Sequence, residues 1–153
     1  MFSSVWAAAI GYFAMAFVSA VVPWVNAEVL MISAVPFAAS RPVLAILVIA
    51  VSAGQMAGKA LVYWVSRRST RPRSPRLQGA IDRWQRRIQH RPRSAMALTF
   101  VSAVAGFPPF FLVSAAAGAL GVAFGGFMLV GSAGRLIHFT IVAFAPDLLR
   151  RIV

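Results

Sequence analysis

Two apolar stretches in this sequence are longer than one membrane-spanning helix, and a soluble fold of this length could not bury them. The first runs for 35 residues from Val5 to Ala39, and the last runs from Ser94 to Pro146. One span across a bilayer needs about 20 apolar residues. Only 12% of the residues are charged, whereas soluble domains carry about 25%. The chain is therefore predicted to be an all-α integral membrane protein.

Prolines and polar residues divide the first stretch. Val5–Val22 is predicted to be a retained membrane helix, because the residues before it lack the basic region of a signal peptide. The segment from Pro23 to Pro36 contains Asn26 and Glu28 and is too short for a second span. Non-helical backbone at membrane depth is tolerated only inside protein or beside water. We therefore predict a re-entrant hairpin or a broken helix here.

The next span is predicted over Val43–Ser66, which is 24 residues long and follows a break at Ser40-Arg41-Pro42. Its Gly54 and Gly58 have the GxxxG spacing that lets two membrane helices approach closely. Chance placement among many small residues is the alternative. The pattern fits tight helix packing at this pair and chance placement equally well.

The segment that separates the apolar stretches is strongly basic. Ten of the fourteen arginines lie between Arg67 and Arg93. Arginine and lysine concentrate in the cytoplasmic loops of membrane proteins, so residues 67–94 are predicted to form a cytoplasmic loop of a multi-pass protein in the cytoplasmic (inner) membrane. A net charge of +12 is also typical of proteins that bind nucleic acid. Its confinement to one loop argues against a nucleic-acid partner.

An amphipathic helix is predicted inside this loop. Its apolar face has helical spacing and consists of Leu77, Ile81, Trp84 and Ile88. Its other faces include the arginines Arg83, Arg86 and Arg87. A basic amphipathic helix with Trp on its apolar side is typical of a helix on an anionic membrane surface. Packing on the protein's own loops is the alternative. The expected partners are membrane lipids, with anionic headgroups at this basic loop.

The last apolar stretch is interrupted by Gly106, Pro108 and Pro109 and again by glycines that include Gly118. Two interpretations stay open: two complete spans, or a hairpin followed by one span over about Gly121–Phe144. The second gives one membrane domain with about three transmembrane helices, two opposed re-entrant hairpins and the cytoplasmic amphipathic helix. Interrupted apolar segments in both halves of a chain indicate a transporter site near mid-membrane.

Glu28 is the most informative polar residue, because it is the only acid within an apolar segment. A charge at the bilayer centre costs about 3 kcal/mol on insertion scales. We predict that Glu28 and Asn26 belong to a proton or substrate site, and an interfacial acid at a hairpin base is the alternative. Lys59 either extends to the interface or pairs with Glu28. Arg135 and His138 lie one helical turn apart and could bind a phosphate or line a path.

Other kinds of chemistry find no support in the sequence. It has no cysteine, which excludes disulfides and thiolate metal sites. His90 and His138 stand apart from other ligand residues, without metal-ligand spacing. No nucleophile with a neighbouring base, phosphate loop or dinucleotide motif is present. We therefore expect no enzyme activity, no metal and no cofactor.

Four segments resemble motifs of the DedA family, also called the VTT or SNARE-associated membrane protein family. They are Pro23-Trp24-Val25-Asn26-Ala27-Glu28, residues 54–67, residues 100–118, and Gly134-Arg135-Leu136-Ile137-His138-Phe139. In chain order they resemble the family's acidic hairpin, its glycine-rich helix ending in Tyr and Arg, its second hairpin ending in Ala-Gly, and its closing Gly-Arg signature. The likeness covers most of the chain.

The sequence departs from the family pattern at three places. The second hairpin lacks the arginines that usually flank its proline, Lys59 replaces an acidic or small polar residue, and His138 replaces a second arginine. The family is associated with lipid-carrier and phospholipid translocation and with proton-dependent membrane homeostasis.

The resemblance implies a transporter of a lipid or lipid-phosphate, with Glu28 as the protonatable group and Arg135 and His138 as headgroup contacts. Two alternatives stay open. One is an exporter of a small solute or ion, and the other is a non-transporting scaffold whose basic loop binds anionic lipid or partners. Self-association into a homo-oligomer also stays open.

Overall fold

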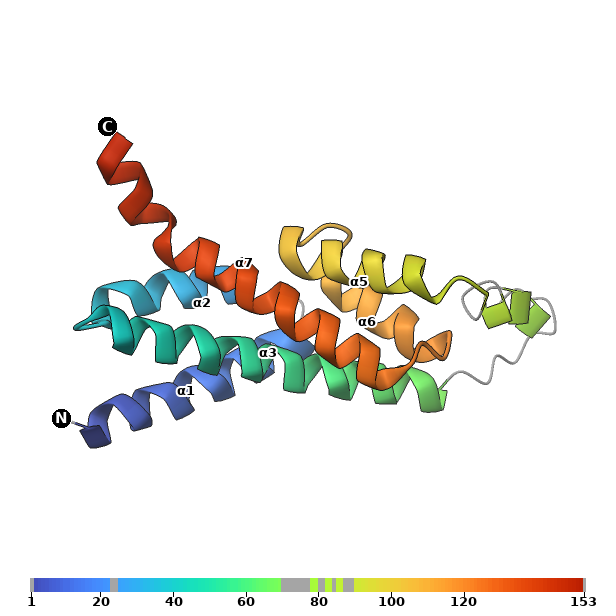
Figure 1. Ribbon diagram of the computed structural model, residues 1–153. Coiled ribbons are helices and arrows are strands. Elements are labelled where there is room, and N and C mark those ends of the chain that lie inside the picture. Colours follow the sequence, from blue (N-terminus) through green and yellow to red (C-terminus); the bar gives the residue numbers. More distant parts are fainter. Residues whose placement is uncertain are drawn as a thin grey trace. The chain divides into compact units, whose positions relative to one another are not determined.

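The computed structural model describes residues 2–22, 25–69, 78–79, 82–83, 85–86 and 90–152, without the side chains of residues 2, 3 and 146–152. Helices make up nearly all of this described part, and it contains no strand. In chain order the elements are α1 (Phe2–Val21), α2 (Ala27–Ala34), the short 3₁₀ helix η1 (Val35–Phe37), α3 (Arg41–Ser69), α5 (Pro92–Ala105), α6 (Phe110–Ala119) and α7 (Phe124–Ile152) (Figure 1). The all-α prediction is confirmed for the described residues.

Three of these helices are long and apolar enough to cross a membrane. Their apolar spans are Ser4–Val21 in α1, Arg41–Ser69 in α3 and Phe124–Ala145 in α7. Both α3 and α7 have 29 residues, and a helix of that length measures about 44 Å at 1.5 Å per residue. The hydrocarbon core of a bilayer is about 30 Å thick. The prediction of three long apolar helices is confirmed.

The remaining apolar helices are too short to cross a bilayer. The segment formed by α2 and η1 covers Ala27–Phe37, α5 has 14 residues and α6 has 10, whereas a span needs about 17 or more. Two complete spans within residues 94–146 therefore do not fit these helix lengths. The short helices have the lengths expected of hairpin arms, and their re-entry into a membrane stays a prediction.

Capping residues and glycine determine where the short helices begin and end. The N-cap of α2 is Asn26, whose Oδ1 accepts a hydrogen bond from the backbone N–H of Glu28 at 2.7 Å. Helix α5 ends at Ala105, and its C-cap Gly106 has φ of 74°, a conformation that glycine adopts without steric cost. The turn that follows is held by Ser102, whose hydroxyl donates to the carbonyl oxygen of Pro108 at 2.5 Å.

The predicted hairpin breaks fall at or beside helix ends where the structure describes them. Pro36 lies within η1. Gly106 and Pro108 lie in the turn between α5 and α6, and Pro109 is the N-cap of α6. Pro23 lies outside the described residues.

The chain forms two compact units, and each has its own packed interior. The first unit is Met1–Gly58 with Arg135–Val153, and the second is Lys59–Gly134. The core of the first consists of side chains from α1, α2, α3 and α7, among them Met31, Val51 and Phe139, which are fully buried. In the second, the ring of Phe127 lies between those of Tyr63 and Phe110, at centroid distances of 5.3 and 6.1 Å.

Glycine allows close helix packing inside each unit. In the first unit, a Cβ added to Gly54 would overlap the carbonyl oxygen of Phe13 on α1, and one added to Gly58 would lie 2.5 Å from the Cβ of Ala20. In the second unit, a Cβ added to Gly118 would overlap the carbonyl oxygen of Tyr63. Small residues permit such close approach of membrane helices, where dispersion contacts replace the hydrophobic effect.

We predict opposite effects for two Gly-to-Ala substitutions in the first unit. Gly54→Ala should lower the free energy of unfolding by about 1–3 kcal/mol, because its methyl group has no room against α1. Gly11→Ala is the matched control, since nothing lies within 4 Å of an added Cβ there and alanine favours the helix by about 0.5–1 kcal/mol. Thermal unfolding of the detergent-purified protein measures both. Equal stability of the two variants would contradict the α1–α3 packing.

Candidate functional site

A polar cluster in the first unit joins the start of α2 to α7. The carboxylate Oε1 of Glu28 lies 3.3 Å from Nε2 of His138. The same carboxylate interacts electrostatically with the guanidinium of Arg135. Half of the Glu28 side chain is exposed, compared with 11% of the His138 side chain. One accessible acid thus faces two shielded basic groups.

The start of α2 positions the acid. Glu28 lies in the first turn of the helix, and its backbone N–H is bound by the Asn26 cap. A carboxylate in the first turn of a helix is favoured by the partial positive charge of the unpaired N–H groups there. The local sequence therefore holds Glu28 at the helix end, with its carboxylate free to meet α7.

The α7 side of the cluster is arranged around Phe139. This ring is fully buried in the core of the first unit. The guanidinium carbon of Arg135 lies 5.5 Å from its centroid, and the His138 ring meets it edge-on at 5.1 Å. Arg135 precedes Phe139 by four residues, so both lie on one helix face. With 8% and 9% of their surface exposed, Arg135 and His138 border an apolar core.

The cluster can carry out two kinds of chemistry. A histidine beside a carboxylate can pass a proton to it or take one from it. An arginine can also hold a carboxylate or phosphate through paired, charge-assisted hydrogen bonds. A phosphate that reached Arg135 would compete with the carboxylate of Glu28 for the same positive charge.

Two predicted site residues make contacts that the sequence did not predict. Asn26 uses its side-chain oxygen to cap α2, and this role was not predicted. Lys59 belongs to the second unit, where it is buried and its Nζ lies 5.3 Å from the ring centroid of Phe111. The predicted pairing of Lys59 with Glu28 stays a prediction. Within the described ranges, no group of three or more metal-ligating side chains occurs.

The structure describes only part of the predicted amphipathic helix. Leu77, Ile81, Trp84, Ile88 and Arg87 lie outside the described residues. Arg83 and Arg86 are helical and exposed. Gln85 donates a hydrogen bond from Nε2 to the carbonyl oxygen of Ala119 at 3.1 Å.

A second polar network in the second unit was missed by the sequence analysis. The hydroxyl of Tyr63 donates to the carbonyl oxygen of Val122 at 2.6 Å, and Nη1 of Arg67 donates to the Tyr63 hydroxyl at 2.6 Å. The Arg67 guanidinium also lies over the ring of Trp64, 5.6 Å from its centroid. The four-residue spacing of Tyr63 and Arg67 could have predicted their contact, because residues four apart are neighbours on a helix.

The helical fold, with three apolar helices of spanning length, is that of the α-helical membrane proteins. Comparison with known proteins finds no family model, no curated protein and no solved structure that matches this chain. The resemblance to DedA motifs therefore stays a prediction from the sequence.

We predict that Glu28 and Arg135 are energetically coupled. Glu28→Gln and Arg135→Gln should each destabilise the protein, and the double variant should lose less than the sum, with a coupling of about 0.5–3 kcal/mol. Thermal unfolding in detergent measures the cycle.

The control cycle pairs Glu28→Gln with Gln55→Leu. Gln55 binds Ser19 and the carbonyl oxygen of Ala16 on α1, so it shares no partner with Glu28 and the two effects should add. Additive effects of Glu28→Gln and Arg135→Gln would show that the two charges do not interact.

Proposed function

We propose that this chain is a membrane transporter that moves a lipid or lipid-phosphate headgroup, in the manner implied by its DedA-like motifs. Glu28 is the proton-binding group, and Arg135 and His138 are the headgroup contacts. The observation that carries the proposal is the 3.3 Å approach of an accessible acid to a buried histidine, together with the electrostatic interaction of the same acid with a buried arginine.

The energetic cost of these groups supports a function for them. Ionisable side chains in membrane segments are unfavourable by several kcal/mol, and they usually face a protein interior or water and mark ion or substrate pathways. Arg135 lies within the apolar span of α7. Glu28 lies in a short apolar segment that is interrupted on both sides. Interrupted apolar segments are typical of transporter sites.

Competition between the Glu28 carboxylate and the lipid phosphate for Arg135 supplies a mechanism that couples proton binding to lipid binding. When Glu28 is ionised, its carboxylate compensates the charge of Arg135. When Glu28 is protonated, this attraction is lost and the guanidinium can hold a phosphate instead. Proton binding and phosphate binding therefore favour each other, and by linkage each raises the affinity for the other by the same factor. Binding of the headgroup should therefore strengthen as the pH falls.

We predict that Glu28→Gln, although less stable, still inserts and accumulates but loses proton-linked translocation. The substitution keeps the shape of the side chain and removes its titration, and a loss of about tenfold lies within ordinary coupling energies. Glu28→Asp should retain more activity than Glu28→Gln, because aspartate still ionises. Translocation of a fluorescent lipid-phosphate in reconstituted vesicles, at several pH values, measures the effect.

The control is Asp82→Asn, which removes another of the three acids in the chain from outside the three candidate spans. It should translocate normally. Full translocation by Glu28→Gln at every pH would remove Glu28 as the coupling group. A scaffold that only binds partners predicts no difference between the Gln and Asp variants.

A further inference from the structure

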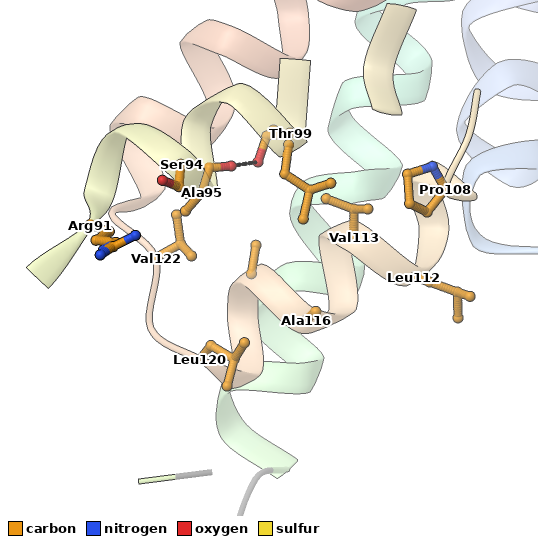
Figure 2. A pocket seen from close by; sticks show the side chains of 12 residues that line it. Arg91, Ser94, Ala95, Thr99, Pro108, Leu112, Val113, Ala116, Leu120 and Val122 are labelled. Carbon is orange, nitrogen blue, oxygen red and sulfur yellow. Dashed lines mark hydrogen bonds between the residues drawn. The ribbon is translucent and has the colours of Figure 1, made fainter. Parts of the chain in front are cut away.

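An open cavity of about 510 Å³ lies between α5, α6 and the turn that leads to α7, all of which belong to the second unit. Arg91, Thr99, Leu112, Ala116 and Val122 are among the twelve residues that line it (Figure 2). Its volume is within the range of about 300–1,000 Å³ that is usual for ligand sites.

The small side chains on the facing helices leave this space open. Ala95 on α5 and Ala116 and Ala117 on α6 all line the cavity. Larger residues at these positions would fill it. An apolar lining favours an apolar occupant, because burying apolar surface is favourable, so we expect the occupant to be a hydrocarbon.

The cavity has one charged end. Figure 2 shows Arg91 at one end and Pro108 and Leu112 at the other. Between them the lining is almost wholly apolar. The hydroxyl of Thr99 donates to the carbonyl oxygen of Ala95 at 2.8 Å, so it is already bonded within its own helix. A cation at one end of an apolar cavity complements an anion that carries a hydrocarbon chain.

The position of Arg91 in the chain agrees with a lipid headgroup. Arg91 is exposed and precedes the first turn of α5, and it belongs to the basic segment 67–93 that is predicted to face the cytoplasm. The cytoplasmic leaflet carries anionic lipids, and arginine near its surface attracts them.

We propose that this cavity binds one acyl chain of an anionic phospholipid, with the lipid phosphate at Arg91. The proposal goes beyond the Glu28 site, since all the lining residues belong to the second unit, whereas Glu28, Arg135 and His138 belong to the first. It requires binding only and holds whether or not the protein translocates lipid.

Photo-crosslinking of the full chain in vesicles tests this proposal. The probes are phosphatidylglycerol and phosphatidylcholine, each with the same diazirine group in the middle of one acyl chain. Peptide mass spectrometry locates the adducts. We expect adducts concentrated on the cavity residues of α5 and α6, and about fivefold more with phosphatidylglycerol, the factor expected for one arginine near an anionic surface.

Two variants with matched controls separate the charge from the cavity. Arg91→Gln should abolish the preference for phosphatidylglycerol, whereas Arg93→Gln, an exposed arginine two residues away that does not line the cavity, should keep it. Ala116→Phe should fill the cavity and remove the adducts with both lipids. Val101→Phe is its control on an exposed position of α5 outside the lining.

The outcomes for this cavity and for the Glu28 site are distinguishable. Glu28→Gln should leave the cavity adducts unchanged while it removes translocation. Adducts spread evenly over the lipid-facing helices, with no headgroup preference, would indicate annular lipid only and overturn the proposal. Unchanged adducts in Ala116→Phe would also overturn it.

Discussion

Arg135 lies in an apolar helix, and only 8% of the residue's surface is exposed. A cation in such surroundings needs an anion nearby. Removing one ion from water costs several kcal/mol unless a partner compensates it. The carboxylate of Glu28 provides that compensation from the first turn of α2, where the helix end itself favours an acid. The short helix α2, its Asn26 cap and the basic groups of α7 therefore act together.

Two features of the fold and three individual site residues could be predicted from the sequence, because each depends on local composition. The lengths of the apolar stretches predicted the three long helices. The positions of Pro36 and of the Gly106–Pro109 segment predicted where the short helices are interrupted. Glu28, Arg135 and His138 stood out individually as ionisable residues in apolar segments. That Glu28 meets His138 could not be predicted, because the contact depends on how α2 packs on α7.

Three other features were not predicted from the sequence, each for a different reason. The capping role of Asn26 could have been predicted, because Asn is a preferred N-cap residue. We instead assigned Asn26 to the site, because it is a polar residue in an apolar segment. The buried position of Lys59 near Phe111 depends on packing between α3 and α6. The cavity beside Arg91 depends on which alanines of α5 and α6 face each other, and helical spacing alone does not reveal such pairs.

We propose that lipid-phosphate takes the place of ionised Glu28 beside Arg135, and that Glu28 binds a proton when this happens. Infrared difference spectroscopy of the reconstituted protein, with and without a lipid-phosphate, measures this directly. We expect a new band of a protonated carboxyl group on lipid addition, present in the unaltered chain and in Asp82→Asn and absent in Glu28→Gln. A missing band in the unaltered chain, or the same band in Glu28→Gln, would contradict it.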